Sequence, residues 1–227
     1  MTDVIELRPK LPETMLKIGR AWFSRYFYRN YDIVTYGDHL VPKTGPVLLL
    51  SNHIGWLDGP LLVALAPRAP HSLVKSEAYE GKTAKMLDAV GQVSVLRKGT
   101  DANAMRTMRS SLLRGQVVLV YPEGTRGQGM FRSIYGGAAY LAATTGAPIV
   151  PIALFGTRIG TEDREAKPEK GRRIEIHYGE PFTMPKLQSP INKKQLEEFK
   201  EELRTKLSDH VRRAQTISQV ELPERIK

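Results

Sequence analysis

The sequence contains no cysteine, which excludes a disulfide framework, a zinc site built from thiolates and a cysteine nucleophile. It also lacks any apolar run near the roughly 18 residues needed to span a bilayer. The best aliphatic runs, residues 47–50 and 61–66, are short and are typical of a buried core. Residues 1–12 lack the hydrophobic stretch of a secretory signal. We therefore expect a protein that does not span a membrane but is able to lie on one.

Two further patterns are missing. No G-x-S-x-G sequence occurs, which disfavours a serine hydrolase built on a nucleophile elbow. The five histidines are scattered and show no ligand spacing, so we expect neither a metal ion nor a resident cofactor. Only one of them, His53, is followed five residues later by an acid, Asp58. That pair is the most informative feature of the chain.

The net charge of +10 is unevenly placed along the chain. Residues 68–132 contain eleven Lys or Arg against five Asp or Glu. Such a cluster implies an anionic partner: a phosphate ester, a coenzyme, an acidic lipid headgroup or a nucleic acid. A solvated basic surface explains the composition as well. Because no nucleic-acid-binding motif is recognisable and the aromatic residues gather elsewhere, we expect no nucleic-acid partner.

Residues 12–30 have the pattern of an amphipathic helix. Met15, Ile18, Trp22 and Tyr26 share one face, and most of the basic residues fall outside it. Basic residues beside an aromatic face fit a helix at a membrane interface, and they fit equally well a helix packed against the rest of the protein. We expect residues 1–31 to form this N-terminal element and residues 32–227 to form the main domain.

From residue 33 onward, short aliphatic or β-branched runs alternate with helical patterns. Strands are expected at residues 33–36, 47–50, 72–75, 93–96, 117–121, 149–154 and 173–178, and helices at 59–66, 82–90, 101–114 and 133–145. This alternation predicts an α/β fold with a mostly parallel central sheet flanked by helices, followed by a C-terminal helix from about Asn192. Residues 173–178 alternate with period two, so we expect an edge strand with one wet face there.

His53 follows the strand predicted at residues 47–50, at the end where open α/β sheets place their ligands. A neutral imidazole is well suited to take up a proton near pH 7, and Asp58 could orient it through the other ring nitrogen. Gly55 would permit the turn that this contact needs. Alternatively, His53 is an ordinary loop residue and Asp58 caps the helix that begins at Gly59.

A second polar group follows the strand predicted at residues 117–121. Glu123-Gly124-Thr125-Arg126 places a carboxylate, a flexible glycine and a guanidinium together, and arginine can hold a phosphate through two hydrogen bonds. Lys75 and Arg97 also come at the ends of predicted strands. A turn with a surface salt bridge is the alternative interpretation. Basic or catalytic side chains nevertheless come at the ends of four predicted strands, counting the one before His53, and this pattern indicates a shared site.

These segments resemble the glycerolipid acyltransferase family, which bacterial 1-acylglycerol-3-phosphate acyltransferases typify. NHIGWLD (52–58) is similar to its His-x4-Asp block and YPEGTR (121–126) to its Glu-Gly-Thr-Arg block. VSVLRKG (93–99) and APIVPIALFGT (147–157) are similar to two further blocks in the family's order. The resemblance covers roughly residues 33–180. It departs in the N-terminal region, which is shorter and more basic than in many bacterial members, and after residue 130, where a Lys-Gly is usual.

The resemblance implies an acyltransferase catalytic domain at residues 32–227. His53 would be the general base and Asp58 its orienting partner. Arg97, Glu123 and Arg126 would hold the acceptor's glycerol phosphate, with Lys75 as a further contact and Gly124 and Thr125 in the same loop. The acyl group would pass from acyl-CoA or acyl-carrier protein to the 2-hydroxyl of 1-acylglycerol 3-phosphate (lysophosphatidic acid), giving phosphatidic acid at the cytoplasmic face of the cell membrane.

Two alternatives remain open at this stage. A member of the same family could use another acceptor, namely glycerol 3-phosphate, a lysophospholipid or a glycolipid. A lipid-binding module without activity is the second, and the presence of His53, Asp58, Glu123 and Arg126 together argues against it.

Overall fold

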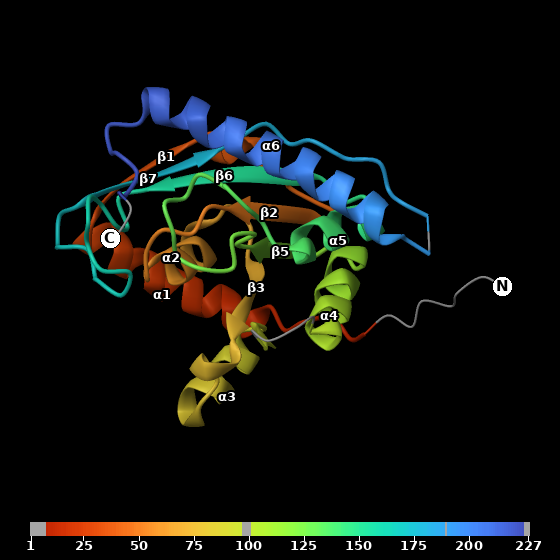
Figure 1. Cartoon of the computed structure of the whole chain (residues 1–227). Helices are drawn as coiled ribbons and strands as arrows, with labels where there is room; N and C mark the ends of the chain where they lie inside the picture. The colour runs from red at the N-terminus through yellow and green to blue at the C-terminus, as the bar shows by residue number, and fades with distance from the viewer. Residues whose placement is uncertain (1–7, 97–100, 189, 225–227) are drawn as a thin grey trace.

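The computed structural model describes residues 8–96, 101–188 and 190–224. Within them, a seven-stranded sheet has the order β1-β7-β6-β2-β5-β3-β4, with helices on both faces (Figure 1). The strands are β1 (Asp32–Tyr36), β2 (Val47–Ser51), β3 (Pro70–Lys75), β4 (Val93–Val95), β5 (Val117–Val120), β6 (Ile149–Phe155) and β7 (Arg173–Tyr178). The helices are α1 (Thr14–Asn30), α2 (Asp58–Leu65), α3 (Gly81–Ala89), α4 (Ala102–Leu113), α5 (Gly136–Thr145) and α6 (Lys193–Ile217). All the predicted strands and helices are present.

The middle of the sheet is parallel. β2 pairs in parallel with β5 and β6, and β3 pairs in parallel with β5 and β4. Among the named strands of the described residues, β6 and β7 form the one antiparallel pair, and β1 runs parallel to β7. The carboxyl ends of β2, β5 and β6 therefore meet at one edge of the sheet. The prediction of a mostly parallel α/β sheet is confirmed.

The expectation of an edge strand with a wet face at residues 173–178 is wrong. β7 lies between β1 and β6, and β1 is the edge strand. The polar residues Glu175 and His177 of β7 are buried, and each has a polar partner on the covered face of the sheet. Glu175 accepts from Arg173 at 2.7 Å and pairs with His177 at 2.9 Å, while His210 of α6 reaches the His177 carbonyl at 3.0 Å.

Two apolar clusters hold the sheet between helices. One joins the sheet to α4, α5 and α6, and the other joins its opposite face to α1 and α2. Every residue of β2 and β6 is buried, which explains why β2 reads as an unbroken aliphatic run rather than an alternating one. The strands that lead to the polar residues at the carboxyl edge, β2, β5 and β6, are thus buried along their whole length.

Helix α1 packs against the domain with only one side. Leu16 and Phe27 are buried, and Arg20 donates hydrogen bonds to the carbonyls of Val63, Ala66 and Arg68 at the end of α2. The apolar face predicted from the sequence points the other way. Its members are exposed by about half or more: Met15 by 53%, Ile18 by 51%, Trp22 by 75% and Tyr26 by 52%. The helix therefore docks on the domain and also presents an uncovered aromatic face.

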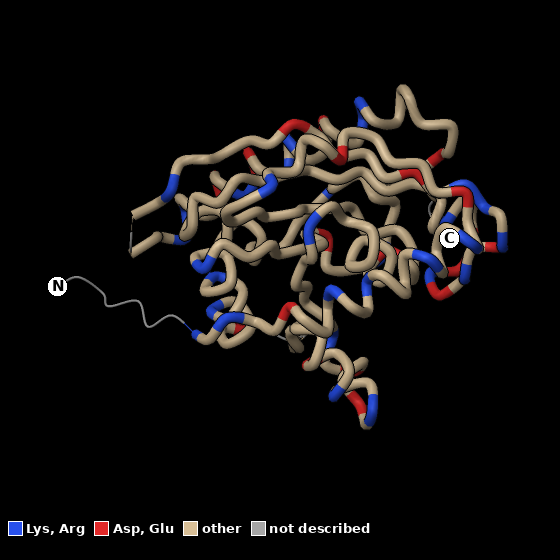
Figure 2. Tube along the Cα trace, turned by 180° about the vertical axis from the view of Figure 1, so that it is seen from behind, with Lys and Arg blue, Asp and Glu red and all other residues tan. Residues whose placement is uncertain are grey.

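The basic residues between positions 68 and 132 do not gather in one segment. Those within the described residues are spread over β3, α3, α4 and the loops around these elements and after β5. Along the trace, Lys and Arg interleave with Asp and Glu, including on the projecting segment that contains α3 (Figure 2). The positive excess is therefore distributed, and any anion site depends on local geometry.

Replacing Arg20 by Met should lower the free energy of unfolding by about 1–3 kcal/mol, because carbonyls at the end of α2 lose their donor. Arg25→Met on the exposed side of the same helix is the matched control, with an expected change within about 0.5 kcal/mol. Urea unfolding measures both. Equal effects of the two substitutions would contradict the role given to Arg20.

Candidate active site

The site begins where β2 ends. Asn52, fully buried, extends the pairing of β2 with β6 through its side chain. Its Oδ1 accepts from the Leu154 N–H at 2.7 Å, and its Nδ2 donates to the Leu154 carbonyl at 3.0 Å. This amide fixes the backbone immediately before His53. Sequence reasoning missed Asn52, because an Asn at a strand end is also an ordinary turn residue.

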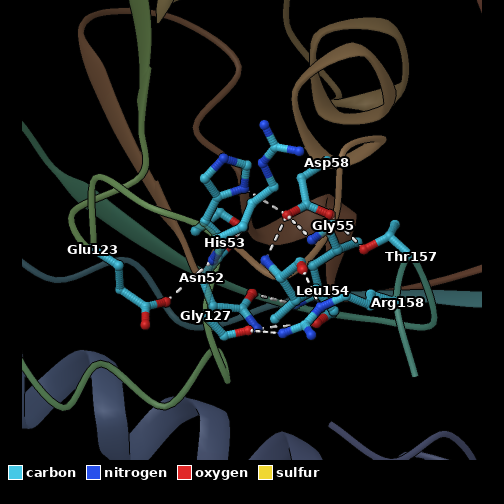
Figure 3. Close-up of polar contacts among 12 residues, drawn as sticks. Asn52, His53, Gly55, Asp58, Glu123, Gly127, Leu154, Thr157 and Arg158 are labelled. Atoms are coloured by element: carbon cyan, nitrogen blue, oxygen red, sulfur yellow. Dashed lines mark hydrogen bonds and ion pairs between the residues drawn. The ribbon is translucent and has the colours of Figure 1, made fainter. Parts of the chain in front are cut away.

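His53 and Asp58 are in contact, as predicted. Nδ1 of His53 lies 2.7 Å from Oδ2 of Asp58 (Figure 3). Because a carboxylate only accepts hydrogen bonds, Nδ1 carries the ring proton and Nε2 carries the lone pair. The His53 side chain is 15% exposed, while that of Asp58 is completely buried. The pair thus has the geometry of a general base with an orienting acid.

The alternative role of Asp58 as a helix cap is wrong. Leu57 holds the N-cap position of α2, and Asp58 is the first residue of the helix. Its Oδ2 instead turns back to accept from the backbone N–H groups of Ile54, at 2.7 Å, and Gly55, at 2.9 Å. The carboxylate therefore organises the loop that carries His53.

Gly55 is needed for a reason different from the predicted one. Its φ is not positive, so the turn itself does not require glycine. A Cβ at this position would lie 2.7 Å from the carbonyl oxygen of Thr157, which no side chain tolerates. The glycine lets the segment after β6 approach the loop after β2.

Thr157 and Arg158 complete the support, and sequence reasoning did not single out either residue. The Thr157 hydroxyl donates to Oδ1 of Asp58. Arg158, 1% exposed, donates through Nε to the Ile54 carbonyl at 2.6 Å and through Nη2 to the Gly127 carbonyl. It joins the two functional loops (Figure 3). Burial lowers the pKa of the Arg158 guanidinium, and the charge of Asp58 partly opposes this shift.

Glu123 lies at the end of β5, next to β2. Its Oε1 accepts from the His53 backbone N–H at 3.2 Å, and the Gly127 N–H donates to the His53 carbonyl at 2.8 Å. Burial, assisted by the negative charge of Asp58, raises the pKa of Glu123 to about 7. In this structure the Glu123 carboxyl group thus supports the backbone of His53.

The rest of the predicted acceptor site is placed as follows. Gly124 has φ +64°, and a Cβ there would lie 2.7 Å from the Tyr135 ring. Thr125 is exposed. The Arg126 guanidinium is 14% exposed and forms an ion pair with Glu165 at 2.7 Å. Lys75 ends β3, on the side of β5 away from β2, and Arg97 lies outside the described residues.

Tyr121 is a further residue that sequence reasoning passed over. Its ring stacks on that of His53, with 4.4 Å between the ring centroids. Burial raises the pKa of Tyr121 well above its usual range, so the phenol stays neutral. The stacked ring limits the rotation of the imidazole and covers one of its faces.

Fold and site together define an α/β protein with a histidine–aspartate pair of the general-base type at the carboxyl edge of its sheet. The family model described as Acyltransferase matches residues 32–155, which is more than half of the chain. The chain belongs to the acyltransferase family.

Relatives of known name agree with this assignment. The chain is 32% identical over 171 residues to a lyso-ornithine lipid O-acyltransferase of Pseudomonas aeruginosa, covering 71% of this chain and 64% of that protein. It is 30% identical over 152 residues to a chloroplastic 1-acyl-sn-glycerol-3-phosphate acyltransferase of Arabidopsis thaliana, covering 62% of this chain and 40% of the relative. The chain thus spans less than two thirds of the length of these relatives.

The fold is shared with a solved structure. The 1-acyl-sn-glycerophosphate acyltransferase PlsC of Thermotoga maritima superimposes with a TM-score of 0.67 at 21% identity, covering 90% of this chain and 81% of that one. This similarity establishes the architecture, including the helices that flank the sheet.

Replacing Thr157 by Val should lower the free energy of unfolding by about 1–3 kcal/mol, because the buried Asp58 carboxylate loses a donor while the volume is kept. Thr157→Ser keeps the hydroxyl and loses one methyl group, and should cost less, about 0.8 kcal/mol. Urea unfolding of the two variants measures the difference. A Val variant as stable as the Ser variant would contradict the hydrogen bond to Asp58.

Proposed function

We propose that this protein transfers a fatty acyl group from acyl-CoA or acyl-carrier protein to the 2-hydroxyl of 1-acylglycerol 3-phosphate, giving phosphatidic acid. The observation that supports this most strongly is the His53–Asp58 contact, on a loop hydrogen-bonded to the Glu-Gly-Thr-Arg loop. The first supplies a base for a hydroxyl, and the second supplies Arg126, a cation suited to a phosphate.

In the proposed reaction, Nε2 of His53 takes the proton from the acceptor hydroxyl as its oxygen attacks the thioester carbonyl. Asp58 stabilises the imidazolium that forms. The tetrahedral intermediate then collapses: the carbon–sulfur bond breaks, and the leaving sulfur receives the proton from His53. The attack is direct, so no acyl-enzyme forms, in keeping with the absence of cysteine. No cofactor takes part in this sequence of steps.

A second acceptor class is supported by one specific finding. The Pseudomonas relative at 32% identity is named for a lyso-ornithine lipid. The same base chemistry serves any lyso-lipid with a free hydroxyl, so the two acceptors differ only in what the headgroup site must recognise. We rank the phosphate acceptor first because the site presents the Arg126 guanidinium.

We also propose that the protein works on a membrane surface. None of the helices within the described ranges is long and apolar enough to cross a membrane. The exposed face of α1, with Trp22 and Phe23 exposed by 75% and 52%, provides the apolar area that an interfacial helix inserts. Lys17, Arg25 and Arg29 on the same helix complement anionic lipid headgroups.

Substituting His53 by Ala should reduce acceptor-dependent thiol release from a long-chain acyl-CoA by about 10²–10⁴-fold, since the base is lost. The assay is run with and without 1-acylglycerol 3-phosphate. His39→Ala, at an exposed histidine, is the control and should keep wild-type turnover. A His53 variant with near-wild-type rates would refute the proposed role.

If the wild type releases no thiol, acyl-carrier protein as donor and lyso-ornithine lipid as acceptor are tested next. Turnover with one of them would reassign the substrate. Absence of thiol release with every combination of donor and acceptor would favour a lipid-binding module without activity.

Replacing both Trp22 and Phe23 by Ser should weaken binding to anionic phospholipid vesicles about tenfold or more, because two large apolar side chains no longer enter the interface. Ile217→Ser removes an exposed apolar side chain from α6, on the opposite face of the sheet, and should leave binding unchanged. Vesicle sedimentation compares the three proteins. Unchanged binding of the double variant would refute docking through α1.

A further inference from the structure

The segment between β6 and β7, residues 159–172, folds back as a closed loop. At its base, Arg172 forms two hydrogen bonds with the Glu162 carboxylate, both at 2.7 Å. The Glu162 carboxylate also accepts from the Ile159 N–H at 3.0 Å, and the Glu162 backbone carbonyl accepts a hydrogen bond from Arg158. The loop is therefore anchored at both ends, and its middle is the part that reaches the functional residues.

The middle of this loop contacts both functional blocks. Glu165 forms its ion pair with Arg126, and the same guanidinium donates to the Arg164 carbonyl at 2.8 Å. Lys167 places its Nζ 5.2 Å from the centre of the Trp56 ring, and Trp56 lies between His53 and Asp58 in the sequence. One short stretch of the loop thus binds Arg126, the residue expected to hold the phosphate, and also contacts Trp56 of the His-x4-Asp block.

The partners of the Arg126–Glu165 pair differ in exposure. The Arg126 side chain is 14% exposed and that of Glu165 is 67% exposed. An ion pair with one solvated partner is weak, so Glu165 can leave at little cost. A phosphate carries more negative charge and more acceptor oxygens than a carboxylate, and it suits the guanidinium fork at least as well. The largely covered Arg126 is the fixed partner, and the exposed Glu165 is the exchangeable one.

We propose that Glu165 is a specificity-determining residue of the acceptor site, because its carboxylate competes with the acceptor's phosphate for Arg126. In the free protein, the Glu165 carboxylate is paired with the Arg126 guanidinium. A phosphate-bearing acceptor displaces it and moves the loop away from Trp56, whereas an uncharged acceptor leaves the pair intact. This inference rests on the proposed function, since it assigns Arg126 to the acceptor phosphate.

Electrostatics around the loop agree with this exchange. Arg126, as hydrogen-bond donor and as charge, lowers the pKa of Glu165, and Lys75 adds to the effect. Glu165 is therefore ionised at neutral pH and lies within the field of two of the cations predicted to bind phosphate. An incoming phosphate would meet the same two charges.

The test compares Glu165→Gln with Glu169→Gln, an exposed glutamate of the same loop, by calorimetric titration with glycerol 3-phosphate and with glycerol. Removing an exposed ion pair should tighten glycerol 3-phosphate binding about two- to fivefold in E165Q, with E169Q unchanged. Turnover should show a lower KM for 1-acylglycerol 3-phosphate with kcat unchanged. Glycerol should show no difference between the variants.

Tryptophan fluorescence provides a readout of the loop that is independent of turnover. The chain has two tryptophans, so Trp22→Phe leaves Trp56 as the reporter. In that background, glycerol 3-phosphate should increase acrylamide quenching of Trp56, and E165Q should show increased quenching without ligand.

The outcomes separate this inference from the proposed function. Equal binding of glycerol 3-phosphate to wild type and E165Q would overturn the competition and leave the acyltransferase assignment intact. Absence of binding to every variant, together with absence of turnover on the phosphate acceptor, would overturn both.

Discussion

The site depends on the burial of one carboxylate. Asp58 is completely shielded from solvent and accepts from the His53 ring, two backbone N–H groups and the Thr157 hydroxyl. A buried charge without donors would cost several kcal/mol, so each of these groups is tied to the presence of the others. The loop conformation, the imidazole tautomer and the approach of the segment after β6 follow from satisfying this single group.

The negative charge of the buried Asp58 carboxylate is also balanced by a residue that does not contact it through a hydrogen bond. The positive charge of Arg158 interacts with Asp58, and its N–H groups donate to the carbonyls of two loops rather than to a carboxylate. Because Glu123 also accepts a hydrogen bond from the His53 backbone, His53 is positioned by neighbours from three strand ends. This arrangement explains why residues widely separated in sequence act as one unit.

Much of the fold could be predicted because strand and helix patterns are local. His53 and Glu123 could be placed together because parallel strands end at a common edge. Thr157 and Arg158 could not, since their partners lie 99 and 104 residues away and no local pattern marks them. The Arg126–Glu165 pair was missed for the same reason. At β7 the period-two pattern is present, but its polar face is covered by α6, which comes later in the chain.

The attachment of α1 through Arg20 has a mechanical consequence. Three carbonyls at the end of α2 receive hydrogen bonds from the Arg20 guanidinium, and α1 and α2 share one apolar cluster with the sheet, so α1 is held to the domain at several points. A lipid surface that took up the aromatic side of α1 would therefore set the tilt and roll of the entire molecule. Lipids confined to that surface would then reach the edge of the sheet that carries His53 by lateral diffusion in two dimensions, and α1 would set the distance between that edge and the lipid surface.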